Sequence, residues 1–93
     1  MSKQKIAMLA LVAISHAAAA HADKPAGDAC AAKLNADGKA IYAATMAATP
    51  TQETLRATVE KETRSLAMGG KIGRGSAREN ATEAGECVRT ALQ

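Results

Sequence analysis

Apolar residues recur three and four positions apart along three stretches of the chain, residues 29–48, 50–68 and 77–91. This spacing places apolar side chains on one face of an α-helix. No stretch of useful length alternates between apolar and polar residues, as a half-buried strand does. The pattern therefore predicts an all-α fold, a small bundle of three to four helices that forms one domain over residues 23–93.

The first stretch contains a weak point. Residues 23–27 read as a flexible lead-in, and Asp28 is placed to cap the helix that follows. Asn35–Gly38 then interrupts this helix, because glycine costs about 1 kcal/mol in a helix interior and Asn and Asp favour turns. The segment is either one helix with a weak point or two short helices.

The other two stretches are preceded by start signals. Thr49 and Pro50 predict a cap and a first helical residue, with Gln52 reaching back as in a capping box. Ser76 and Glu79 have the same capping-box spacing before the last helix. The expected core is small and has no Phe or Trp; its members are Leu34, Ile41, Tyr42, Met46, Leu55, Val59, Leu66, Met68, Ile72, Val88 and Leu92.

The N-terminal residues have the order of an export signal. Lys3 and Lys5 precede an apolar run over residues 6–14, and Ala20-His21-Ala22 follows. Positive charge, a short apolar core and small residues in this order are typical of a secretory signal peptide. The core is too short for a membrane-spanning helix, which needs roughly 20 apolar residues. We expect residues 1–22 to be cleaved off and the protein to be periplasmic or secreted, without stable membrane insertion.

Cleavage would change the charge of the working protein. Residues 23–93 contain 10 Lys and Arg against 9 Asp and Glu, so their net charge is close to +1. Binding to nucleic acid needs a larger basic surplus or a basic face. Both histidines, His16 and His21, fall in the segment that would be removed. These numbers argue against a nucleic-acid partner.

Cys30 and Cys87 are the two cysteines, and an exported protein with an even number favours a disulfide. In a simple three-helix bundle these positions lie at opposite ends, whereas a disulfide needs Cα atoms within about 7 Å. A split of the first helix near Gly38, a return path through the glycine loop, or a steeply crossed last helix would each bring them together. We favour the split.

The residues of 23–93 offer little for catalysis. Acid–base and nucleophilic chemistry usually require His, a free Cys or paired carboxylates in a pocket. Glu79, Glu83 and Glu86 share a helix face, which is more typical of a solvated amphipathic helix than of a metal site. We predict no enzyme activity, no cofactor and no metal.

The segment between the last two helices has the most functional content. Gly69 is expected to end the preceding helix, and the glycines and cations that follow suit an anion at the start of the last helix. The alternative is a flexible connector with solubilising charges. The candidate anion-binding residues are Gly70, Lys71, Gly73, Arg74, Gly75 and Arg78.

Three features carry a family resemblance: the Ala20-His21-Ala22 ending, the pair Cys30 and Cys87, and the segment Gly70–Ser76. In these the chain resembles small alanine-rich exported proteins of Burkholderia-type bacteria. The resemblance implies export and no particular activity. In size and in its single disulfide the chain is also similar to periplasmic acid-stress chaperones, from which it differs by having Tyr42 as its sole aromatic residue and by its weak apolar surface.

Two classes of function follow. The first is a non-enzymatic binding or interaction protein of the cell envelope, whose partner is another protein or an anionic envelope component. The second is a stress-type chaperone that loosens at low pH, which requires carboxylates that are paired in the folded state. Circular dichroism at low pH distinguishes them, because a fold that stays intact there argues against the chaperone.

Overall fold

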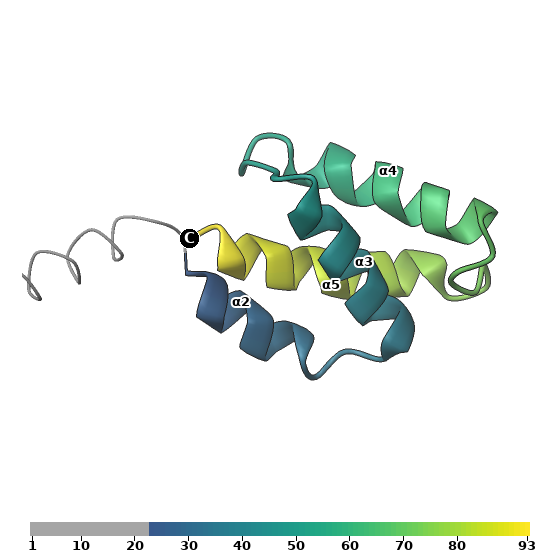
Figure 1. Ribbon diagram of the computed structural model, residues 1–93, viewed down its shortest axis with the longest axis horizontal. Coiled ribbons are helices and arrows are strands. Elements are labelled where there is room, and N and C mark those ends of the chain that lie inside the picture. The colour runs from purple at the N-terminus through teal and green to yellow at the C-terminus, as the bar shows by residue number, and fades with distance from the viewer. Residues whose placement is uncertain (1–22) are drawn as a thin grey trace, which may run out of the picture.

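The computed structural model describes residues 23–93, which form four α-helices and no strand. The helices are α2 (Lys24–Ala31), α3 (Ala36–Ala47), α4 (Leu55–Met68) and α5 (Ala77–Ala91) (Figure 1). The predicted all-α class is confirmed. The expected signal peptide, residues 1–22, lies outside the described residues. Among residues 23–93, no helix is both long and apolar enough to cross a membrane.

Helix α5 is the centre of the fold. It packs against α2, α3 and α4, and α3 also contacts α4. Figure 1 shows α2 and α4 on opposite sides of α5, with α3 crossing the front of it. The last turn of α5 ends beside the start of α2, so segments far apart in the sequence close one end of the bundle.

The expected split of the first helix is confirmed, but the break lies before Gly38 rather than at it. Asn35 is the N-cap of α3, and its Oδ1 accepts a hydrogen bond from the Gly38 N–H at 2.7 Å. The Asn35 Nδ2 donates to Asn80 Oδ1 on α5 at 2.9 Å, and Asn80 is only 4% exposed. One side chain therefore begins α3 and fixes its position on α5.

The prediction that Asp28 caps the first helix, after a flexible lead-in, is wrong. Helix α2 already begins at Lys24, and Asp23 accepts a hydrogen bond from the Ala26 N–H at 3.2 Å. Pro25 lies in the first turn, where backbone N–H groups have no acceptor within the helix, so the N–H that proline lacks costs no hydrogen bond. Asp28 is therefore inside α2, where its side chain is available for other contacts.

The disulfide between Cys30 and Cys87 joins α2 to α5, as predicted. The two Cα atoms lie 5.4 Å apart, within the range that a disulfide requires. Cys87 is 1% exposed and belongs to the main core. The split between α2 and α3 makes this pairing possible, because it allows α2 to run beside the last turns of α5.

Gly27 allows α2 and α5 to approach closely. A Cβ atom at this position would lie 2.8 Å from the Ala91 Cα and 2.8 Å from the Tyr42 hydroxyl, and it would also collide with the Ala91 Cβ. Backbone atoms cannot give way to such a group without a shift of the whole helix. Glycine is thus required here for packing.

Helix α4 begins at Leu55 and not at Pro50, so the prediction of a helix start at Thr49 is wrong. Thr49 has a φ of 49°, which is not a helical cap conformation. Thr51 and Thr54 instead bind each other: the Thr51 N–H donates to Thr54 Oγ1 at 2.8 Å, and the Thr54 N–H to Thr51 Oγ1 at 3.2 Å. These bonds form a separate turn, which competes with helix.

Helix α5 begins at Ala77, as predicted, but Ser76 makes no side-chain capping bond. The expected capping box is therefore absent. Ala84, Val88 and Ala91 of α5 are buried, while Ala77 and Ala81 are only partly buried. The buried face of α5 is consequently built mostly from small side chains.

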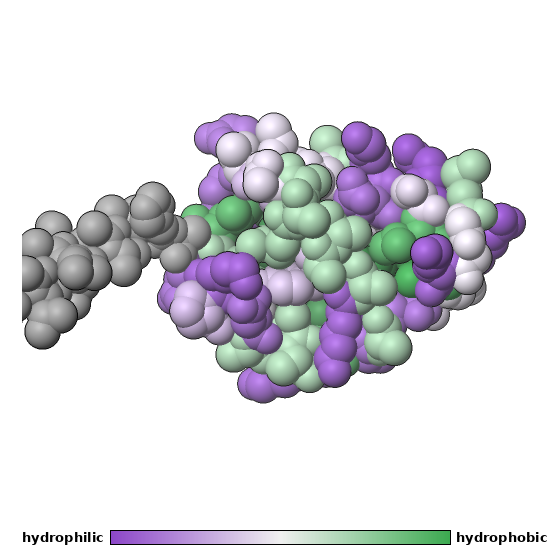
Figure 2. Space-filling view, in the orientation of Figure 1, coloured by the Kyte–Doolittle hydropathy of each residue, from purple (hydrophilic) through white to green (hydrophobic). Residues whose placement is uncertain are grey.

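The core is smaller than the sequence suggests. Ile41 and Val88 are fully buried at its centre, together with the polar Thr45. Met68, an expected core residue, is 72% exposed instead. Figure 2 shows the face that carries α3, where small apolar side chains form a pale band between hydrophilic groups.

Opening the disulfide is expected to destabilise the protein strongly. Closing a loop between positions separated by 57 residues restricts the unfolded chain by about 4 kcal/mol in the chain-entropy estimate. Urea denaturation of the oxidised and reduced protein, followed by circular dichroism, measures this difference. Equal denaturation midpoints would show that the packing of α2 on α5 does not depend on the bond.

Gly27 and Gly85 both lie within helices but in very different surroundings, so alanine substitutions at the two positions form a matched pair of variants. Gly27→Ala is expected to lower the unfolding free energy by roughly 1–3 kcal/mol, because it overpacks the contact between α2 and α5. Gly85→Ala should raise it by about 0.5–1 kcal/mol, because its Cβ meets only the Val59 Cγ2 at 3.8 Å and alanine favours helix. Thermal denaturation measures both, and a loss of stability in both variants would contradict this account.

Candidate functional site

The glycine-rich segment, residues 69–75, starts where α4 ends. Gly69 is the C-cap, as predicted, and Gly70 takes the positive φ of 73° that glycine adopts without strain. The Gly70 N–H donates to the Ala67 carbonyl at 3.1 Å and the Lys71 N–H to the Leu66 carbonyl at 2.9 Å. This pair of bonds is a Schellman motif, so the first part of the segment has a defined structure.

The middle of the segment is anchored to the bundle. Ile72 is 5% exposed and belongs to the core. The Gly73 N–H donates to the Asp37 carboxylate at 3.0 Å. A backbone donor that was a candidate for binding an external anion therefore already has an anionic partner on α3.

The cations around this segment all face solvent. Lys71, Arg74 and Arg78 are exposed, and none takes part in the three ion pairs found within residues 23–93. Lys71 and Arg74 lie in the loop, and Arg78 lies in the first turn of α5. They share one end of the molecule and leave that end positively charged, while their role in anion binding stays a prediction.

A groove lies between α4 and α5. Its volume is about 770 Å³, and no residue of α2 or α3 lines it. Seven residues from each helix form its walls with the same spacing, so the groove follows both helices for about 18 Å. The α4 wall consists of Leu55, Arg56, Val59, Glu60, Thr63, Arg64 and Ala67, and the α5 wall of Ala77, Arg78, Ala81, Thr82, Gly85, Glu86 and Arg89.

Small residues make the floor of the groove on the α5 side. Ala77, Ala81 and Gly85 are four positions apart and therefore lie in one row along the helix. None of them extends beyond Cβ, which leaves space between the two helices. The groove exists because this row offers nothing that would fill it.

The rims of the groove are charged unevenly. At the end away from the glycine loop, Arg56 pairs with Glu60 at 3.6 Å, and Arg89 pairs with Glu86 at 3.3 Å. Glu60 and Arg64 are also four positions apart, but Glu60 pairs with Arg56 and not with Arg64. Arg64, at the loop end, has no carboxylate within ion-pair distance among the described residues.

The sequence pointed to only part of this site. Arg78 is the one predicted anion-binding residue that also lines the groove. Ala77 and Ala81 belong to the apolar positions that recur along residues 77–91 and predict a helix face, and Gly85 is not among them. The unusual position of a glycine in that same row was the signal that could have indicated a groove.

The carboxylates of α5 do not form a cluster suited to a metal. Glu79, Glu83 and Glu86 are exposed, and Glu86 is engaged with Arg89. Within the part of the chain that the structure describes, no group of three potential metal-ligating side chains comes together.

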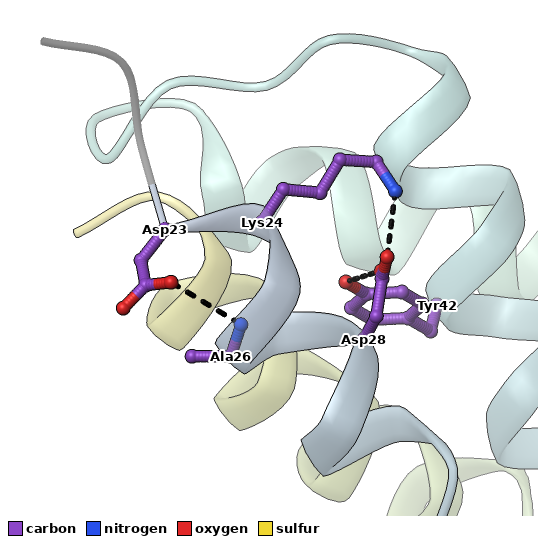
Figure 3. Close-up of polar contacts among 5 residues, drawn as sticks. All are labelled: Asp23, Lys24, Ala26, Asp28 and Tyr42. Atoms are coloured by element: carbon purple, nitrogen blue, oxygen red, sulfur yellow. Dashed lines mark hydrogen bonds and ion pairs between the residues drawn. The ribbon is translucent and has the colours of Figure 1, made fainter. Parts of the chain in front are cut away.

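A second polar cluster links α2 to α3. The Tyr42 hydroxyl donates to Asp28 Oδ1 at 2.8 Å, and the Lys24 Nζ donates to Asp28 Oδ2 at 2.8 Å (Figure 3). Tyr42 is buried, whereas Lys24 and Asp28 are largely exposed. The cluster ties the start of α2 to α3 on the side where Gly27 meets α5.

This cluster shifts two pKa values in opposite directions. The hydrogen bonds from Lys24 and Tyr42 lower the pKa of Asp28 below its ordinary value of 3.8. Burial, and then the bond to Asp28, raise the pKa of Tyr42 to about 12. The Asp28 contribution to stability is therefore present above pH 3.8 and is lost as the pH falls through the lowered pKa.

Comparison of the chain with protein-family models, with curated proteins and with solved structures finds no match.

Because Tyr42 is the sole tyrosine and the chain has no tryptophan, its ionisation can be followed directly by ultraviolet absorbance. Rapid pH-jump titration of the folded protein should give a pKa of about 12. Asp28→Asn should lower this value, because the neutral amide no longer opposes the phenolate, and Asp23→Asn should leave it unchanged. A Tyr42 pKa that is the same in all three proteins would contradict the link between α2 and α3.

Proposed function

We propose that this protein is an exported, non-enzymatic binding protein of the cell envelope, and that the groove between α4 and α5 holds a protein partner. The groove carries the proposal. It is long, open along two helices, apolar on its floor and charged on its rims, which is the form in which proteins receive a helical segment of a partner.

The composition of the groove favours a macromolecular partner over a small substrate. Small-molecule sites are usually lined by large apolar and aromatic side chains with a few convergent polar groups. Here the α5 side of the floor is formed by alanine and glycine, the α4 side adds only Leu55, Val59 and Ala67 as apolar residues, and the sole aromatic residue, Tyr42, lies elsewhere. A surface of this kind offers extended contact along a helix rather than a closed pocket.

Two features support a place outside the cytoplasm. The disulfide between Cys30 and Cys87 is of a kind that persists in oxidising compartments and is rare in the cytosol. The sequence of residues 1–22 has the order of an export signal. The envelope is therefore where we expect the partner.

The stress-type chaperone is the second candidate, and the Asp28 cluster is the observation that favours it. Protonation of Asp28 at low pH would release its bonds to Lys24 and Tyr42 and loosen α2. The disulfide, however, continues to hold α2 to α5. Acid would therefore open this part of the fold only in part, which makes the groove the stronger basis for function.

Site-specific photo-crosslinking tests the proposal. A benzophenone amino acid is placed at Thr82, an exposed residue on the groove rim, in the cells that make the protein. The expected result is a discrete adduct with another polypeptide in the envelope fraction. Gly85→Leu, which fills the groove floor, should reduce this adduct strongly.

The matched control carries the same probe at Glu83, the exposed next residue of α5, which does not line the groove. No adduct is expected there. Equal adducts from both positions, an adduct confined to the cytoplasm, or none at Thr82 would contradict the proposed function.

A further inference from the structure

The charge distribution of the groove indicates what kind of helix it receives. Arginines occur at both ends, but only those at the end away from the loop have carboxylate partners within the described chain. Arg64 and Arg78, on opposite walls near the glycine loop, have none. Lys71 and Arg74 in the adjacent loop are also without ion-pair partners among residues 23–93.

The sequence accentuates this asymmetry. Between positions 61 and 78 there are five cations and one carboxylate, Glu62, and even with Glu79 and Asp37, which adjoin this end, the cations stay in excess, although residues 23–93 as a whole are close to neutral. The cations are Lys61, Arg64, Lys71, Arg74 and Arg78. A partner that covers this end therefore binds most tightly if it carries carboxylates at the contact.

The floor of the groove leaves room for a helix of the partner beside α4 and α5. Helices pack with their axes 8–10 Å apart, and the smaller distances need small residues at the contact. The row Ala77, Ala81 and Gly85 supplies them. The fold does not require a glycine at position 85, because an alanine Cβ there would make only ordinary contact with Val59 at 3.8 Å.

An exposed apolar residue continues the α4 rim. Met68 lies one helical turn after Arg64 and is 72% exposed, the one large apolar side chain in the described residues that is so open to solvent. Methionine is flexible and is common on surfaces that bind helices. It sits at the same end as the unpaired cations.

Resting on the function proposed above, we propose that the groove takes an amphipathic helix of a protein partner, oriented so that its carboxylates lie over Arg64 and Arg78. Its small apolar side chains contact the row Ala77, Ala81 and Gly85. A membrane surface is a poorer match, because the rims away from the loop are internally neutralised. Single-stranded nucleic acid would require aromatic stacking groups, and the groove has none.

The test uses three synthetic helices that share one alanine- and leucine-rich face and have blocked termini. Their last turns carry glutamates, glutamines or lysines. Fluorescence anisotropy measures their binding to the protein with its disulfide intact. The glutamate helix should bind about fivefold to tenfold more tightly than the glutamine helix, with the lysine helix weakest. High salt should reduce the difference.

A pair of double variants locates the effect. Arg64→Gln with Arg78→Gln should abolish the preference for glutamate. Lys33→Gln with Lys39→Gln removes the same charge from exposed positions outside the groove and should leave the preference in place. All four side chains are exposed, and circular dichroism verifies that each variant stays folded.

Several outcomes would overturn the proposal. These are equal binding of the three helices, equal loss in the two double variants, no binding at millimolar concentration, and displacement of the glutamate helix by phosphatidylglycerol vesicles or by self-association of the protein. If the Thr82 adduct persists while the glutamate preference is absent, the groove binds a partner of other chemistry. If the adduct is absent as well, the proposed function itself fails.

Discussion

The close packing of α2 against the end of α5 is the contact on which the rest of the fold depends. Gly27 allows the two backbones to meet at Ala91, and the disulfide between Cys30 and Cys87 holds them there. The chain has few large apolar side chains and no Phe or Trp, so the packing of a short helix such as α2 adds little hydrophobic stabilisation. The bond compensates by restricting the unfolded chain.

Helix α5 can pack against three other helices because its side chains are small. Its buried face carries Ala84, Val88 and Ala91, and polar contacts help to define where α2 and α3 lie. Asn80 accepts from Asn35 at the start of α3, and Tyr42 of α3 donates to Asp28 of α2. Small apolar residues alone permit several similar arrangements, so these directional bonds select one of them.

The groove arises from the same property of α5 on its adjacent face. Where Ala77, Ala81 and Gly85 meet α4, there is not enough side chain to fill the space, and a furrow remains. The glycine lowers the stability of an isolated helix by about 1 kcal/mol relative to alanine. At position 85, a residue that leaves room for a partner therefore makes the helix less stable, which matters in a protein with a small core.

Local patterns in the sequence account for the all-α class and the last helix, because helical periodicity and a glycine-bounded segment involve residues close together in the chain. The disulfide is predictable for another reason, since Cys30 and Cys87 are the two cysteines of the chain. The sequence does not decide where α2 and α4 begin, since Asp23 and the Thr51–Thr54 turn compete with other residues that are equally able to cap a helix. Three features follow from how the helices pack: Asp28 bonds to Tyr42, Met68 faces solvent, and α4 and α5 leave a groove between them. Each of these depends on which helix faces meet, and the periodicity of an alanine-rich helix does not distinguish a face that packs from one that stays open.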